Sequence, residues 1–151
     1  MANAFRLACV QVNAGNEIAP NLEIASQLTR QAAAEGADFI SLPECVALLE
    51  PDRAALLRKS ATAADHPALK AFTDLAGELG KWIHVGSLAV LSEGGRVANR
   101  TFLIDPHGSV TATYDKIHMF DVDLDGGESY RESNTYQPGD AAVMADLPWG
   151  A

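Results

Sequence analysis

The sequence predicts an α/β fold, and three observations support this prediction. Apolar runs rich in β-branched residues alternate with stretches whose apolar residues recur every three or four positions. Glycine and proline stand at the boundaries of these segments, and the first three follow the order strand, helix, strand. This order favours a right-handed crossover between two parallel strands. With 151 residues, the chain has the usual length of one domain and can bury a core.

The first three segments make up this strand–helix–strand unit. Residues 5–12 are mostly apolar and predict a buried strand that places Cys9 in the core. Residues 18–32 have apolar side chains at helical spacing, and Gly36 follows them as a stop. Residues 38–42 are short and apolar and end at a proline, which predicts the second strand.

Two helices and a long strand are expected next. Residues 51–59 predict a short helix, and a longer helix opens at residues 65–67, where a capping residue precedes proline, and ends at Gly80. Residues 82–91 predict a strand in which Gly86-Ser87 allows a bulge or a close backbone approach.

The remaining strands are predicted to be antiparallel. Turn residues separate residues 82–91 from another strand at 97–105, so these two should form a hairpin. A second tight connection leads to a strand at 110–114. After a loop from 121 to 140, residues 142–147 predict one more strand.

Composition excludes several functional classes. Twenty acidic against 11 basic residues give a net charge of −9, and no cluster of basic residues offers a surface for nucleic acid. No apolar stretch has the length of a membrane span or of a signal peptide core, so we expect a cytoplasmic protein. Cys9 and Cys45 match neither a disulfide framework nor a metal-ligand spacing, and both are expected to be reduced.

Chemically active side chains concentrate in residues 114–121. This segment contains a lysine, a histidine and two aspartates between apolar residues, and a predicted strand leads into it. Lys116 is therefore expected near the end of a strand, where rigid backbone can direct a catalytic cation. The pattern is also compatible with solvated ion pairs of Asp115, Lys116 and Asp121. His118 is expected to be a hydrogen-bonded structural residue rather than a base.

Glu44 is the candidate general base. It follows directly after the buried strand at 38–42, a place where α/β proteins often carry functional groups. Partial burial would raise the pKa of its carboxyl group, and a nearby lysine would lower it. Together these two effects can set the pKa of the glutamate in the range that a general base needs. A purely structural Glu44 remains the alternative.

A calcium-loop pattern overlaps the same region. Residues 121–132 fit D-x-D-x-D-G-x5-E, the spacing of an EF-hand loop, so an acidic calcium-binding module is an alternative function. However, position eight is Glu128 instead of an apolar residue, a strand-like pattern precedes the loop, and Pro138 follows soon after it. These flanks argue against two helices, so we expect an acidic loop at the rim of a site, and no metal.

Five short motifs in order together resemble the nitrilase superfamily of carbon–nitrogen hydrolases. They are Leu42-Pro43-Glu44, Gly86-Ser87, Asn99-Arg100, the run from Tyr114 to Asp121, and Glu132-Ser133-Asn134 with Pro138-Gly139. The run Lys-Ile-His-hydrophobic-Phe-Asp and the Asp-rich loop that leads to Glu-Ser are similar to those of the branch that contains ω-amidase. The resemblance covers the whole chain and implies an αββα sandwich. Residues 1–151 would be the N-terminal half of one such domain, ending before the strand that carries the nucleophile.

The resemblance also implies a catalytic set of Glu, Lys and Cys that hydrolyses a small amide without metal or organic cofactor. Glu44 would be the general base, Lys116 the cation that stabilises the oxyanion, and Glu132 the second glutamate, which positions the substrate and the lysine. The complete protein would be a homo-oligomer.

The nucleophilic cysteine of the family would follow the segment that matches residues 142–147, and this chain has no cysteine there. Cys45 is not expected to replace it, because neighbouring side chains on an extended strand point in opposite directions. We therefore expect the chain alone to be inactive. A non-enzymatic interaction protein with the first half of the fold is a further alternative.

Overall fold

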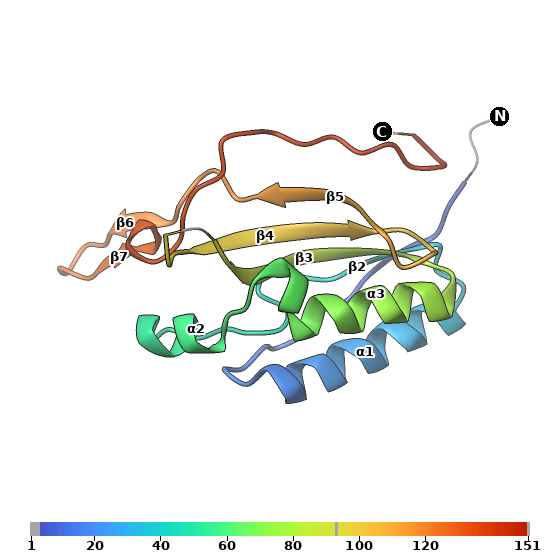
Figure 1. Cartoon of the computed structure of the whole chain (residues 1–151), viewed down its shortest axis with the longest axis horizontal. Helices are drawn as coiled ribbons and strands as arrows, with labels where there is room; N and C mark the ends of the chain where they lie inside the picture. The colour runs from blue at the N-terminus through green and yellow to red at the C-terminus, as the bar shows by residue number, and fades with distance from the viewer. Residues whose placement is uncertain (1–3, 93, 151) are drawn as a thin grey trace.

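A mixed five-stranded sheet lies at the centre of the computed structural model, which describes residues 4–92 and 94–150 (Figure 1). Its strands are β1 (Leu7–Cys9), β2 (Phe39–Ser41), β3 (Trp82–Leu91), β4 (Val97–Ile104) and β5 (Val110–Asp115), in that order across the sheet. The pairs β1–β2 and β2–β3 are parallel, whereas β3–β4 and β4–β5 are antiparallel. The predicted parallel unit and the predicted hairpin are both confirmed.

Two helices cover one face of this sheet. Helices α1 (Ile18–Ala34) and α3 (Pro67–Leu79) lie side by side beneath it in Figure 1, and α2 (Arg53–Lys59) lies at one end. The core fills the space between these helices and the sheet. Its largest fully buried side chains include Phe72, Phe102, Ile40, Ile83 and Ile104. No helix within the described ranges is long and apolar enough to cross a membrane.

Local sequence determines the boundaries of α3. The Nδ1 atom of His66 accepts a hydrogen bond from Ala68 N–H at 3.3 Å, so this imidazole caps the first turn, and Pro67 occupies the first helical position. Gly80 ends the helix with a φ of 62°, a left-handed conformation that costs glycine little. The predicted start and end of this helix are therefore confirmed.

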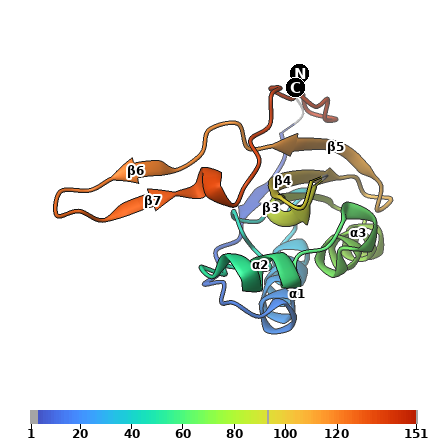
Figure 2. The same cartoon turned by 60° about the vertical axis from the view of Figure 1, so that its left-hand side comes forward.

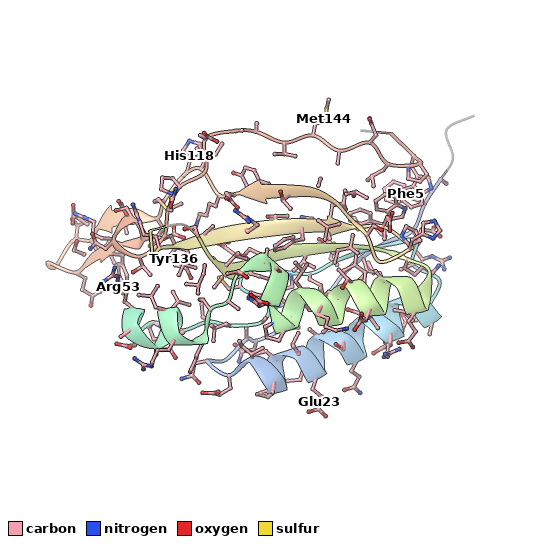
Figure 3. The ribbon with its side chains drawn as sticks, in the orientation of Figure 1. Phe5, Glu23, Arg53, His118, Tyr136 and Met144 are labelled. Carbon is pink, nitrogen blue, oxygen red and sulfur yellow. The ribbon has the colours of Figure 1, made fainter. Side chains whose placement is uncertain are left out.

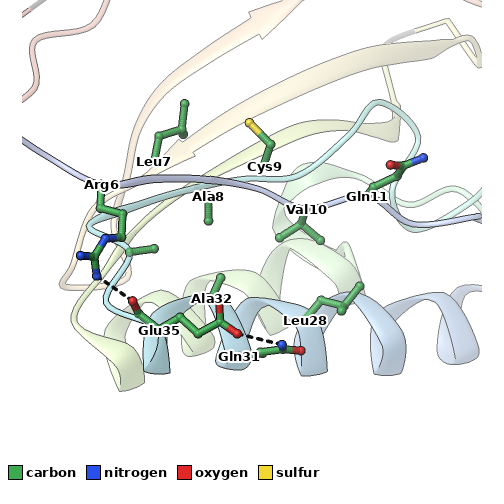
Figure 4. Close-up of a pocket in the computed structure, with 11 residues that line it drawn as sticks. Arg6, Leu7, Ala8, Cys9, Val10, Gln11, Leu28, Gln31, Ala32 and Glu35 are labelled. Carbon is green, nitrogen blue, oxygen red and sulfur yellow. Dashed lines mark hydrogen bonds between the residues drawn. The ribbon is translucent and has the colours of Figure 1, made fainter.

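The first strand is shorter and more exposed than predicted. The strand spans residues 7–9, and Leu7 is 51% exposed. Figure 4 shows Ala8 and Val10 directed toward α1, with Leu7 and Cys9 directed away from it. The predicted core position of Cys9 is wrong, because β1 is an edge strand and no helix covers this face of it.

The strand predicted at residues 142–147 is also wrong. This segment joins no sheet, and its single bridge links Leu147 with Gly150. It crosses the sheet face opposite the helices (Figure 1). The ring of Trp149 stacks on that of Phe5 with centroids 4.8 Å apart. Its apolar residues line a cavity of about 420 Å³ with Phe39, His84 and Leu103, so they contact the face of the sheet instead of extending its edge.

The predicted loop from 121 to 140 contains regular structure. Strands β6 (Asp121–Asp123) and β7 (Ser129–Arg131) form a hairpin that projects from the body of the molecule (Figure 2), and a short 3-10 helix, η2 (Glu132–Asn134), follows it. The hairpin returns the chain to the end of the sheet at which β5 stops.

Candidate functional site

The site is organised around Lys116, the first residue after β5. Its backbone N–H donates to the carbonyl of Asn99 at 3.0 Å, which continues the pairing of β5 with β4. Its Nζ atom lies 2.9 and 3.1 Å from the two carboxylate oxygens of Glu132 and 3.4 Å from Oε1 of Glu44. The predicted convergence of Glu44 and Lys116, which are 72 positions apart, is confirmed.

Glu44 begins the turn that follows β2, and its side chain is 59% exposed. Its Oε1 atom accepts a hydrogen bond from Nδ2 of Asn99 at 2.6 Å in addition to the contact with Lys116. Asn99 is 4% exposed within β4, so this donor is held rigidly. One carboxylate oxygen of Glu44 is thus held by two donors from neighbouring strands, while most of the side chain faces open space.

Glu132 is more enclosed than Glu44. Its side chain is 14% exposed, and its Oε2 atom accepts from the backbone N–H of Phe120 at 2.6 Å as well as from Lys116. Three hydrogen bonds from two donors, Lys116 and the Phe120 amide, therefore hold this carboxylate in place. Glu132 thus restrains Lys116 in addition to the contact with Glu44.

The two carboxylates keep Lys116 charged. Partial burial by itself would lower the pKa of its ammonium group, but the hydrogen bond with Glu132 and the charge of Glu44 outweigh burial, and the pKa is raised above its ordinary value. Lys116 is therefore a cation throughout the neutral range. A fixed cation at the end of a rigid strand can stabilise an anion that develops beside it.

A cavity of about 580 Å³ opens beside this cluster. It lies between the turn after β2, helix α2 and the β6–β7 hairpin, and its lining includes Glu44, Lys116, Glu132, Cys45 and Tyr136. Figure 3 places Arg53 and Tyr136 at this end of the molecule. Burial, with the nearby groups of Cys45, Glu132 and Glu44, raises the pKa of the Tyr136 phenol, so it stays neutral.

A second cavity, of about 550 Å³, lies between β1 and α1 (Figure 4). Its polar lining consists mainly of Arg6, Gln11, Gln31 and Glu35, and Arg6 donates to the carbonyl of Glu35 at 2.7 Å. None of the predicted site residues borders it. Of these two cavities, only the first is lined by Glu44, Lys116 and Glu132.

Cys45 lies closer to the site than the sequence analysis expected. Its backbone is not extended but left-handed, with a φ of 52°, and it lines the same cavity as Glu44. The argument that its side chain must point away from the site is therefore wrong. Burial, followed by the charge of Glu44, raises the pKa of its thiol, so the reactive thiolate is disfavoured. That Cys45 is not the nucleophile remains a prediction on this different ground.

The calcium alternative gains no support from the hairpin. Oδ1 of Asp121 accepts from Ser133 N–H at 3.0 Å, and Asp123 forms an ion pair with Arg131 at 2.6 Å. A strand precedes this loop and a 3-10 helix follows it, where an EF-hand has two α-helices. Within residues 4–92 and 94–150, no three His, Cys, Asp or Glu side chains are grouped as metal ligands.

The sequence and fold both match a known family. A sequence model described as carbon-nitrogen hydrolase matches residues 6–150. The chain belongs to the carbon–nitrogen hydrolase family. The expected nitrilase-type α/β fold is thereby confirmed, since the chain also superposes on the C. elegans NitFhit protein with a TM-score of 0.88 at 23% identity. That superposition covers 99% of this chain and 37% of the other.

Two curated relatives show where this hydrolase chain stands in the family. It is 36% identical over 153 residues to the deaminated glutathione amidase of Yersinia enterocolitica, covering 99% of this chain and 52% of the relative. It is 31% identical over 146 residues to the omega-amidase of Homo sapiens, covering 97% of this chain and 52% of the relative. The chain thus spans about half the length of these relatives.

Sequence analysis of this hydrolase chain missed part of the site. Asn99 appeared only within a motif, although a run of polar residues between the apolar ends of a predicted strand is a usable indication of a hydrogen-bonding role. His118, expected to be hydrogen-bonded, is exposed, and no hydrogen bond to its ring is found in the described part of the chain (Figure 3). Asp115 does form an ion pair, since it accepts two hydrogen bonds from Arg100 at 2.6 and 2.8 Å.

Proposed function

We propose that this chain supplies the general base and the oxyanion-stabilising cation of an amidase that hydrolyses small amides. One observation carries the proposal: Nζ of Lys116 lies between two carboxylates, 3.4 Å from Glu44 and 2.9 Å from Glu132, at the border of a cavity. A solvated surface ion pair does not need a second carboxylate or a buried amide donor. This cluster has both, in Glu132 and Asn99.

The two glutamates differ in a way that suggests separate roles. Glu132, 14% exposed, accepts two hydrogen bonds from Lys116 and one from the Phe120 amide, and fixes the position of Lys116. Glu44, 59% exposed, faces the cavity and can exchange a proton with a group that enters it. The proposed base is therefore Glu44, and Glu132 is the residue that positions the cation.

The proposed reaction has two stages. Glu44 takes the proton of a thiol, the sulfur forms a bond to the amide carbon, and the C=O electron pair moves onto oxygen beside the Lys116 ammonium. The tetrahedral intermediate then collapses, the C–N bond breaks, and the leaving amine receives the proton from Glu44. Water, deprotonated by Glu44, next attacks the thioester, which releases the carboxylic acid and restores the thiol.

The thiol in this scheme does not belong to this chain. Cys45 lies beside Glu44, but burial and the charge of Glu44 raise the pKa of its thiol, so it is a poor nucleophile. We propose that the nucleophile comes from the remaining half of the family's domain. The expected inactivity of the chain alone, its cytoplasmic location and a homo-oligomeric complete protein are parts of this same proposal.

The substrate class follows from the cavity and from the relatives. A space of about 580 Å³ has the size of a small-molecule site. The curated relatives carry the names omega-amidase and deaminated glutathione amidase, and both names denote amidases. We therefore assign a small aliphatic amide as the substrate class.

An assay with and without the second half tests the proposal. The purified chain, and the chain co-expressed with a polypeptide that carries the remaining half of the domain, are given small ω-amides and simple aliphatic amides, and ammonia is measured. We expect turnover only in the second sample. Glu44→Gln should reduce it by at least about 100-fold, the usual contribution of a general base.

Glu78→Gln is the matched control, because Glu78 is also an exposed glutamate in an ion pair, but with Arg30 on the helices. It should leave turnover unchanged. Turnover by the chain alone that is abolished both by Glu44→Gln and by Cys45→Ala would show that the nucleophile is Cys45 and would overturn the assignment.

A further inference from the structure

The turn that carries Glu44 has an unusual backbone. Cys45, the next residue, has a φ of 52°, and within the described ranges it is the one residue other than glycine with a positive φ. A side chain with a Cβ atom is disfavoured in this left-handed region. Such a conformation persists only where surrounding contacts hold it. The turn beside Glu44 therefore depends on a support.

A hydroxyl group on β3 supplies this support. The backbone N–H of Cys45 donates to Oγ of Ser87 at 2.9 Å. Ser87 is 2% exposed, so water has little access to replace the hydroxyl as acceptor. Without the oxygen of Ser87, the Cys45 amide would be left without a hydrogen-bond acceptor beside a buried side chain, which costs free energy of folding.

The position of Ser87 is itself determined by the bulge in β3. The backbone N–H of Gly86 donates to the carbonyl of Leu42 at 3.1 Å, and that of Ser87 donates to the carbonyl of Pro43 at 3.4 Å. The hydroxyl of Thr101 donates to the carbonyl of Gly86 at 2.7 Å. The bulge is therefore bonded to the chain on both sides, and it directs Ser87 toward the turn.

We infer that Ser87 is a positioning residue for Glu44. Its hydroxyl holds the left-handed backbone at Cys45, and this backbone directs the Glu44 carboxylate toward Asn99 and Lys116. Burial cannot do so, because the Glu44 side chain is 59% exposed. The value of this positioning for catalysis rests on the proposed function, but the positioning itself can be measured without turnover.

The inference predicts how the site changes when the oxygen is removed. In Ser87→Ala the backbone at Cys45 is free to leave the left-handed region, which turns the Glu44 side chain away from its partners. Lys116 then keeps Glu132 but loses the nearby charge of Glu44. In the assembled enzyme, kcat should fall more than KM changes, since Glu44 acts on proton transfer and not on binding.

The direct test measures the pKa of the Lys116 ammonium by NMR titration. Glu44→Gln should lower this pKa because it removes a nearby negative charge. Ser87→Ala should lower it in the same direction, and the double variant should show no further fall. Ser60→Ala is the matched control, because the buried hydroxyl of Ser60 donates to the carbonyl of Leu56 in α2.

If Ser87→Ala lowers the melting temperature as Ser60→Ala does and leaves the Lys116 pKa at its wild-type value, Ser87 is merely a buried structural hydroxyl and the inference is overturned. If the variant does not fold, hydrogen exchange of the unmodified protein still tests whether the Cys45 amide is held by Ser87. The Cys45 amide should exchange as slowly as amides of the sheet, and exchange as fast as in an exposed loop would also overturn the inference. Neither measurement depends on amidase activity, so this inference and the proposed function can fail separately.

Discussion

Gly86 is the position where a single added methyl group should do most damage to the site. A Cβ atom built there would lie 2.4 Å from the carbonyl oxygen of Leu42 and 2.5 Å from the carbonyl carbon and oxygen of Pro43. These are backbone atoms of the segment that leads from β2 to Glu44, so no side-chain rotation can relieve the contact. In Gly86→Ala, β3 and this segment must move apart.

The geometry sets the size of the effect. Cβ atoms essentially never approach another heavy atom closer than 3.0 Å, so the contact with Leu42 is at least 0.6 Å too short. Overpacking of this kind costs typically 1–3 kcal/mol, and three backbone contacts place Gly86→Ala at about 3 kcal/mol. For a chain of about 150 residues, this loss lowers the melting temperature by about 6–12 °C.

Gly77→Ala provides a control of opposite sign. Gly77 lies inside α3, and a Cβ atom there would meet its nearest neighbour, the carbonyl oxygen of His107, at 3.5 Å, an ordinary contact. Alanine in a helix interior is more stable than glycine by about 0.5–1 kcal/mol. The melting temperature of this variant should therefore rise by about 1–4 °C.

Thermal unfolding followed by circular dichroism measures both changes, and urea unfolding with an unchanged slope would show that they are changes in stability. A melting temperature of Gly86→Ala within about 1 °C of the wild type would refute the close approach of β3 to Leu42. The support that the bulge gives to the Glu44 turn would then lose its basis.

Three further outcomes are expected. Glu132→Gln removes the charge that positions Lys116 and should reduce kcat of the proposed assembled amidase by up to about 100- to 1,000-fold, the cost of losing the oxyanion donor itself, while Glu78→Gln should leave kcat unchanged. Burial lowers the pKa of His66 below its ordinary value of 6.5, so the folded state binds fewer protons than the unfolded state. The contribution of His66 to the free energy of unfolding, measured in urea, should therefore be fully present above pH 6.5 and decrease as the pH falls below it. His66→Asn retains a capping acceptor and should weaken this pH dependence. Residues 121–132 should bind calcium no more tightly than about millimolar in calorimetry, since no helix pair organises the loop, and micromolar binding would contradict the hydrolase assignment of this loop.

Local sequence determined the elements whose causes are local. The boundaries of α3 follow from its capping residue, Pro67 and Gly80, and the strand predicted at residues 82–91 has the same limits in the structure. The order strand, helix, strand was sufficient to predict parallel pairing of β1 and β2. The element boundaries depend on neighbours within a few positions, and the parallel pairing follows from the order of the elements through the rule for right-handed crossovers.

The types of residue in the site were also evident from the sequence, but their partners were not. Glu44, Lys116 and Glu132 were expected in one site, and the structure brings them together. That Asn99 donates to Glu44, and that Ser87 holds the next amide, became visible only in the fold. These contacts join residues 55 and 42 positions apart, and only the pairing of strands determines them.

The errors share one physical cause. An apolar, strand-like pattern states that a segment favours extended backbone and burial, but not which surface will cover it. Residues 5–12 and 142–147 have this pattern, and the structure leaves Leu7 and Cys9 exposed and lays the second segment across the open face of the sheet. At Cys45 the backbone is left-handed and its amide donates to Ser87 of β3, whereas the preceding strand suggested an extended backbone. Sequence alone thus determined the elements and the chemistry that this chain can offer, whereas long-range packing decided where the chain turns, what it buries and which polar atoms meet.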